Sequence, residues 1–140
     1  MARALILFLL LQLPGMARAQ LPVPPSEVVR IQEVIASQVM AFREGDLEEA
    51  FSFAAPGIQA TFGNPQTFGV MVERGYGQIF STLDFNFEDT LGNELQPIQA
   101  VRFTGTDLTA VMAFYFMELQ PDREWRIAGV SLQPLADQAI

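Results

Sequence analysis

The sequence predicts an α+β domain in which N-terminal helices pack on one side of a curved antiparallel sheet of about four strands. Apolar residues recur every three to four positions in the first half of the chain and at alternate positions in the second half. Turn residues separate the segments of the second half, which is typical of a meander. A short segment with the features of a signal peptide precedes both halves.

Residues 1–19 have the order of regions found in a secretory signal peptide. Arg3 gives the start a positive charge, an apolar run follows, and Ala17 and Ala19 supply the small residues that signal peptidase reads. The run is about half as long as a membrane-spanning helix requires. We therefore predict cleavage between Ala19 and Gln20, a periplasmic or secreted protein, and no stable membrane anchor after cleavage.

The rest of the chain predicts one domain between two short flanking segments. Residues 20–25 contain three prolines, which favour an extended tether over a helix. Residues 26–134 are long enough to bury a core and are expected to form a single domain. Residues 135–140 are expected to be a loose tail.

The first half of this domain predicts helices. Ser26 is a suitable N-cap for an amphipathic helix over residues 27–44, and Gly45 is a suitable stop. Asp46 and Glu49 have the spacing of a capping box, which opens a second helix. The shorter helices are expected over residues 46–54, 58–62 and 65–74.

The second half predicts four antiparallel strands, over residues 83–88, 98–104, 108–119 and 124–133. In the third strand both faces are apolar, because Val111, Ala113 and Tyr115 alternate with the equally apolar Met112 and Phe114. One face can meet the helices. The other face predicts contact with a curled sheet, a ligand, a second subunit or another protein.

Several segments carry a resemblance to a known superfamily: Phe42–Asp46, the short helix after it, and the terminal strand Glu124–Gly129. They resemble the nuclear-transport-factor-like superfamily, whose cone-shaped α+β fold is shared with ketosteroid isomerase and polyketide cyclases. Ala50–Pro56 and Phe68–Val72 are similar to a family of short exported bacterial proteins catalogued as a domain of unknown function. The resemblance covers about residues 27–133. It implies a fold but no single activity, because the superfamily includes isomerases, dehydratases, ligand binders and dimerisation modules.

Charge and composition exclude several classes of function. The eight basic residues are all arginine, and loss of Arg3 and Arg18 with the signal leaves six against 16 acidic residues, a net charge near −10. Such a surface repels nucleic acid. The chain has no histidine and no cysteine, which excludes Ser-His-Asp and Cys-His nucleophile sites and the usual zinc and copper sites. We predict no metal site and no cofactor.

Carboxylates and aromatic residues remain as candidate site residues. The resemblance places Asp46 as a candidate for proton transfer, although an N-cap is its expected role. The candidate pocket is aromatic and consists of Phe42, Phe62, Tyr76, Phe114, Tyr115 and Trp125.

The leading hypothesis is a non-enzymatic binding or interaction module outside the cytoplasm. Its partner is expected to be a small apolar ligand or a second copy that pairs through the sheet as a homodimer. The alternative is an isomerase- or dehydratase-like enzyme that uses a pocket carboxylate on a small apolar substrate. A structural protein without a small ligand is a third hypothesis.

Overall fold

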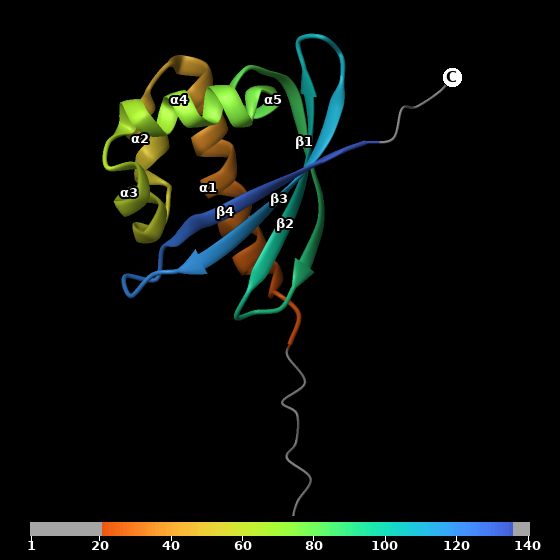
Figure 1. Ribbon diagram of the computed structural model, residues 1–140. Helices are drawn as coiled ribbons and strands as arrows, with labels where there is room; N and C mark the ends of the chain where they lie inside the picture. Colours follow the sequence, from red (N-terminus) through yellow and green to blue (C-terminus); the bar gives the residue numbers. More distant parts are fainter. Residues whose placement is uncertain (1–20, 136–140) are drawn as a thin grey trace, which may run out of the picture.

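The computed structural model describes residues 21–135, which form a helical layer on one face of an antiparallel sheet (Figure 1). The predicted signal peptide, its cleavage point and residues 136–140 lie outside the described residues. The helices are α1 (Pro25–Glu44), α2 (Leu47–Ser52), α3 (Pro56–Phe62), α4 (Pro65–Gly75) and α5 (Gly77–Phe80). The strands are β1 (Thr82–Gly92), β2 (Pro97–Gly105), β3 (Ala110–Leu119) and β4 (Trp125–Pro134).

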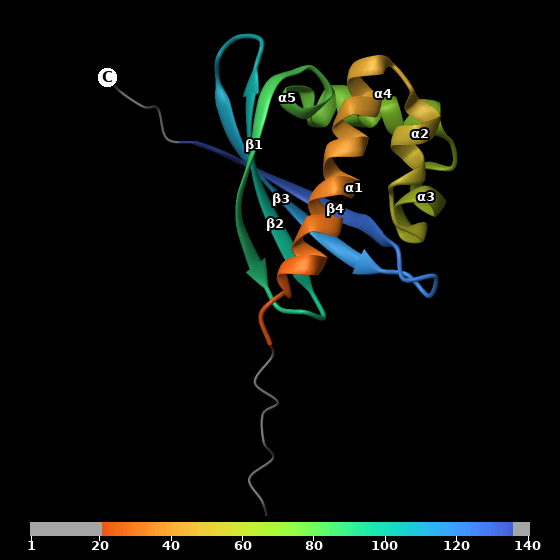
Figure 2. The same cartoon turned by 180° about the vertical axis from the view of Figure 1, so that it is seen from behind.

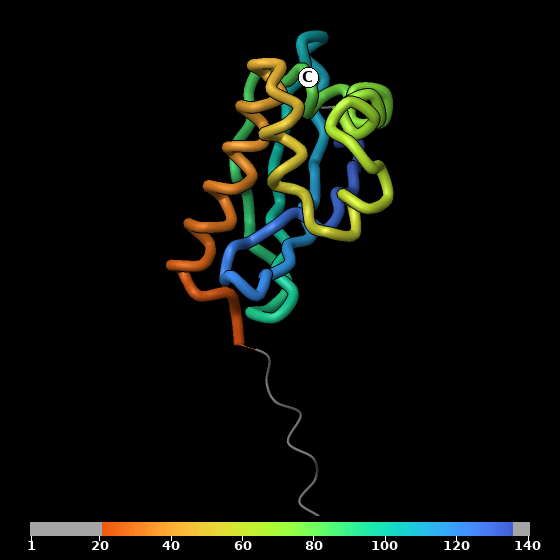
Figure 3. Tube along the Cα trace, turned by 90° about the vertical axis from the view of Figure 1, so that its left-hand side faces the viewer, coloured from red at the N-terminus to blue at the C-terminus, as the bar shows by residue number. Residues whose placement is uncertain are grey.

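The four strands follow one another in the sheet in chain order, and every neighbouring pair is antiparallel. This arrangement confirms the predicted α+β class and the predicted meander. Figures 1 and 2 show the helices gathered on one side of a strongly twisted sheet. In Figure 3, seen from the helical side, α1 stands beside the smaller helices in front of the strands.

Helix α1 is anchored to three different strands by side-chain hydrogen bonds. Near its start, Glu27 Oε2 accepts a hydrogen bond of 2.6 Å from Trp125 Nε1 on β4. In its middle, Gln32 Nε2 donates to Gln99 Oε1 on β2 at 3.3 Å. Near its end, Arg43 donates to the backbone carbonyl of Thr82 on β1. The helix is therefore held along its whole length against the inner face of the sheet.

The N-terminal end of α1 differs from the prediction. Pro24, and not Ser26, occupies the N-cap position, and Pro25 is the first helical residue, where a missing N–H removes no hydrogen bond. The residues before it are not a free tether. The Leu21 carbonyl accepts from the Glu94 N–H at 2.9 Å, and Val23 packs against the core.

Two further differences lie at short turns. Strand β3 begins at Ala110, two residues later than predicted, because Leu108 has a left-handed φ of 65° and Asp107 Oδ1 accepts from the Thr109 N–H at 3.0 Å. These features close the turn before the strand. Helix α5 was not predicted, since one turn is too short to show helical periodicity.

The two faces of the sheet have different surroundings. Val101, Phe103, Ala113 and Tyr115 point toward the helices and are completely buried. Phe116, on the opposite face of β3, is 42% exposed. Ile98, Met112 and Phe114 share that outer face and are half-buried. The doubly apolar pattern of the third strand therefore corresponds to one face under the helices and one that no described element covers.

Candidate functional site

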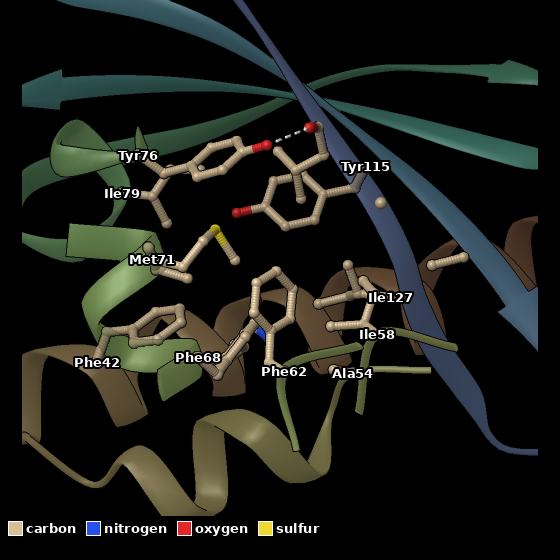
Figure 4. A pocket seen from close by; sticks show the side chains of 15 residues that line it. Phe42, Ala54, Ile58, Phe62, Phe68, Met71, Tyr76, Ile79, Tyr115 and Ile127 are labelled. Carbon is tan, nitrogen blue, oxygen red and sulfur yellow. Dashed lines mark hydrogen bonds between the residues drawn. The ribbon is translucent and has the colours of Figure 1, made fainter. Parts of the chain in front are cut away.

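A pocket of about 260 Å³ lies between the helices and the inner face of the sheet, near β4 (Figure 4). Its helical wall includes Phe42 of α1, Phe62 of α3 and Met71 of α4, and its sheet wall includes Tyr115 and Ile127. Most of the lining is apolar. Pockets for small molecules commonly have this composition, and this volume lies just below their usual range.

The pocket has buried walls and a more exposed rim. Phe42, Ile127 and Tyr115 form buried walls, whereas Phe62 and Met71 are only half-buried. On the sheet side, Ala128 is an exposed lining residue. It is the extra residue of a β-bulge, because Ile127 pairs with Met117 and Gly129 pairs with Phe116. The irregular edge of β4 therefore forms part of the rim.

The segment between α2 and α3 fixes one side of the pocket. The Ala55 N–H donates to the Ile127 carbonyl at 2.8 Å, and the Ile127 N–H donates to the Phe53 carbonyl at 2.9 Å. Gln59 Nε2 reinforces this segment with bonds to the carbonyls of Phe51 and Ala54. The edge of β4 is thereby covered locally, and α3 is held at the rim.

Phe68 on α4 joins the aromatic side chains of the helical wall. Its ring centroid lies 5.9 Å from that of Phe42, 5.3 Å from that of Phe51 and 6.1 Å from that of Phe62. Asn64 places this helix, since its Oδ1 accepts from the Thr67 N–H at 2.8 Å as an N-cap. Tilted ring pairs at these distances add stability beyond burial alone.

Three polar side chains reach the pocket: Gln38, Tyr76 and Tyr115. Gln38 Nε2 donates to the Ala50 carbonyl at 3.0 Å, and Tyr76 Oη donates to the Val130 carbonyl at 3.1 Å. Both side chains are therefore engaged with the backbone around the pocket.

Tyr115 differs from the other two. The residue is fully buried, and its hydroxyl has no hydrogen-bond partner among the described residues. Figure 4 shows this hydroxyl pointing from β3 into the pocket toward Met71. Burial raises the pKa of Tyr115 far above its ordinary value, so the group stays protonated and acts as a hydrogen-bond donor.

Four of the six aromatic residues predicted for a pocket line it: Phe42, Phe62, Tyr76 and Tyr115. Phe114 does not, because it alternates with Tyr115 along β3 and its side chain lies on the outer face of the sheet. Trp125 packs instead against the start of α1, where Glu27 accepts its indole N–H. Sequence analysis missed Met71, whose helical spacing is the same as that of ordinary core residues.

Asp46 is placed as a helix cap and not as a pocket residue. Its exposed carboxylate accepts from the Glu49 N–H at 3.0 Å at the start of α2. Among the described residues, none that lines the pocket carries a carboxylate. The structure therefore contradicts the assignment of Asp46 to proton transfer in this pocket, because the helix N-terminus holds the side chain elsewhere.

No cluster of three or more acidic, histidine or cysteine side chains suitable for a metal ion occurs in residues 21–135. Within the same range, none of the helices has both the length and the apolar character needed to cross a bilayer.

Comparison with known proteins shows the family and the fold of the chain. Residues 26–140 match the family described as Domain of unknown function (DUF4864). The chain belongs to this family. The resemblance predicted from the sequence, to a domain of unknown function, is thereby confirmed. The sequence matches none of the curated proteins.

The fold of this DUF4864 chain is similar to a solved structure described as an NTF-2 like protein of unknown function from Shewanella oneidensis MR-1. The TM-score is 0.52 at 12% sequence identity, and the match covers 76% of this chain and 98% of that chain. At this identity the likeness shows the fold alone. It confirms the predicted nuclear-transport-factor-like architecture.

Proposed function

We propose that this DUF4864 protein is a non-enzymatic binding module whose pocket holds a small, largely apolar molecule. The observation that carries the proposal is the unpartnered hydroxyl of Tyr115 in the wall of a largely apolar cavity of about 260 Å³. Protein interiors are close-packed, and their buried polar groups are almost always hydrogen-bonded. An open space beside a buried hydroxyl without a hydrogen-bond partner is suited to bind a small molecule.

The groups around the pocket favour binding over catalysis. The isomerase-like alternative requires a carboxylate in the pocket, and the described lining residues include none. A tyrosine is protonated near neutral pH, and burial raises the pKa of Tyr115 further, so it supplies no general base. Proton abstraction from a substrate therefore has no acceptor among the lining side chains.

Toluene is a suitable first probe because it is small and has no hydrogen-bonding group. We expect it to shift the methyl NMR signals of Ile58 and Met71 at the rim, with a Kd on the order of 1 mM. The signals of Val29, an exposed residue of α1, should stay unchanged. Absence of any shift in the pocket methyl groups at saturating toluene would rule out an apolar binding site.

A matched pair of substitutions on α4 tests whether toluene binds in this pocket. Met71→Trp should block binding because Met71 lines the pocket. Val70→Trp adds the same ring one residue away, at a position that is 46% exposed and outside the pocket, and should leave toluene binding unchanged. Equal loss in both variants would show that the effect is not local.

A specific surface favours self-association as a second function. The outer face of the sheet carries the apolar residues Ile98, Met112, Phe114 and Phe116 between Arg102 at one end and Glu118 at the other. A two-fold axis through this patch brings each Arg102 near Glu118 of the other copy, which gives an isologous and charge-complementary dimer.

Light scattering tests this homodimer. We expect a dimer for the domain without its signal and a monomer for Phe116→Arg, which places a charge in the apolar centre of the patch. Leu108→Arg is the control, since Leu108 is 74% exposed in the turn before β3 and lies outside the patch. A monomeric wild-type domain at high micromolar concentration would exclude the dimer.

Export is the remaining part of the proposal. The charged start, apolar run and Ala17–Ala19 motif of the sequence support a cleaved signal and a periplasmic or secreted product. Mass spectrometry of the full-length chain expressed in a bacterium should find a mature protein that begins at Gln20. An intact N-terminus would contradict export by this route.

A further inference from the structure

We infer that the pocket selects a neutral molecule with one oxygen acceptor, such as a carbonyl or ether oxygen, that takes a hydrogen bond from Tyr115 Oη. This inference rests on the proposed function, which assigns the pocket to a small apolar molecule. It adds the chemical class of that molecule and the residue that recognises it.

Tyr115 is the lining side chain whose hydrogen-bond donor has no partner among the described residues. The hydroxyl of Tyr76 already donates to Val130, and the amide of Gln38 already donates to Ala50. The Tyr115 hydroxyl is buried, has no partner among the described residues and points into the pocket (Figure 4). A single permanently protonated donor at this depth requires an acceptor on the ligand.

The lining also determines the charge of the acceptor. Among the described residues, none that lines the pocket is an arginine or carries any other positive charge. A carboxylate at the depth of Tyr115 would lose its hydration and gain one hydrogen bond without a counter-ion, which is strongly unfavourable. A neutral carbonyl or ether oxygen loses far less on leaving water, and one phenolic donor satisfies it.

The other side chains that line the pocket near Tyr115 indicate that the rest of the ligand is apolar. Phe42, Phe68 and Ile127 surround the space beside Tyr115, and Met71 closes it from α4. A compact hydrocarbon ring or short branched chain contacts such walls, whereas further polar groups would meet no partner among these side chains. The predicted class is therefore a small neutral ketone, ester, ether or similar molecule.

Cyclohexanone and methylenecyclohexane are the matched probes. They have nearly the same shape, but the oxygen acceptor of the first is a CH₂ group in the second. Their affinities are measured for wild type and for Tyr115→Phe, which removes the hydroxyl and keeps the ring. We expect the substitution to lower the preference for the ketone about fivefold, as for a neutral hydrogen bond.

The two probes differ in their free energy of hydration, but this difference is the same for wild type and variant. It therefore cancels when the two affinity ratios are compared. Ser81→Ala is the control, because it removes a hydroxyl that donates to the Gly77 carbonyl outside the pocket, so the ratio of the two affinities should not change. Cyclohexanecarboxylate at pH 8 should bind much more weakly than cyclohexanone, since it carries a negative charge.

The possible failures are distinct. If both probes bind and Tyr115→Phe leaves their ratio unchanged, recognition through Tyr115 is wrong but the apolar binding site remains. If cyclohexanecarboxylate binds as tightly as cyclohexanone, the neutral class is wrong. If neither methylenecyclohexane nor toluene binds, the proposed function itself is wrong, and the inference fails with it.

Discussion

Trp125 and Tyr115 are both large aromatic residues on the inner face of the sheet, and both carry one polar hydrogen. At Trp125 the indole N–H has a close partner, Glu27, and the residue is 3% exposed between α1 and β4. At Tyr115 the hydroxyl is buried just as deeply but has no partner among the described residues. The two residues lie on neighbouring strands of one core, yet only Trp125 has a hydrogen-bond partner for its polar hydrogen among the described residues.

This difference suggests that the surroundings of Trp125 and those of Tyr115 have different roles. Arg30 also contacts Glu27, with a distance of 3.2 Å between Arg30 Nη1 and Glu27 Oε1. At the contact between α1 and β4, both the indole N–H of Trp125 and the carboxylate of Glu27 therefore have partners. An unsatisfied buried hydroxyl lowers the stability of a free protein, and such groups persist where they serve a function. The region around Trp125 is therefore structural support, and under the proposed function the region around Tyr115 is the place where a ligand binds.

The largest expected effect is at Glu27. Glu27→Ala should lower the free energy of unfolding by about 2 kcal/mol, because it removes a charged acceptor and leaves the buried indole N–H of Trp125 without a partner. Urea unfolding followed by Trp125 fluorescence measures this change. Glu27→Gln keeps an oxygen acceptor and should lose less than the alanine variant. Equal losses would show that the hydrogen bond contributes little.

A smaller effect of opposite sign is expected at Tyr115. In the absence of ligand, Tyr115→Phe should raise the free energy of unfolding by about 1 kcal/mol, since it removes a polar group buried without compensation. Tyr76→Phe is the matched comparison and should lower it by about 1 kcal/mol through loss of the bond to Val130. Thermal and urea unfolding measure both. A destabilised Tyr115→Phe would mean that the hydroxyl is satisfied in the free protein.

The smallest effect concerns pH. The hydrogen bond from Trp125 lowers the pKa of Glu27 below its ordinary value of 4.5, and the charge of Arg30 acts in the same direction against the opposing effect of burial. Because the folded-state pKa is the lower one, the stabilisation is present above pH 4.5 and is lost as the pH falls through the folded-state pKa. Unfolding curves between pH 7 and pH 3, compared with Glu27→Gln, should show a shallower decline in the variant.

Local signals predicted most of the fold. The periodicity changes from helical to alternating near residue 80, Gly45 ends α1, and Asp46 and Asn64 cap the helices that follow them. These features depend on residues close together in the chain, so short-range patterns reveal them. Pro25 misled the prediction because a proline suits both an extended tether and the first turn of a helix.

The candidate site was predictable only in part, because alternation alone does not say which face of a strand is covered. Tyr115 and Phe114 are adjacent and similar in character, and the register of β3 sends them to opposite faces. Trp125 was expected in the pocket, and Glu27, which lies 98 positions away in the chain, holds it elsewhere. No local pattern links residues at that separation.

The sequence by itself determined the class of fold, the predicted export signal, the acidic character of the chain and the absence of histidine and cysteine chemistry. These properties follow from composition and from interactions between near neighbours. The tertiary structure decided that Asp46 caps a helix, that Trp125 is satisfied and that Tyr115 is not. Burial and hydrogen-bond partners depend on packing between segments distant in the chain, and that packing turned one tyrosine of the core into the candidate recognition group.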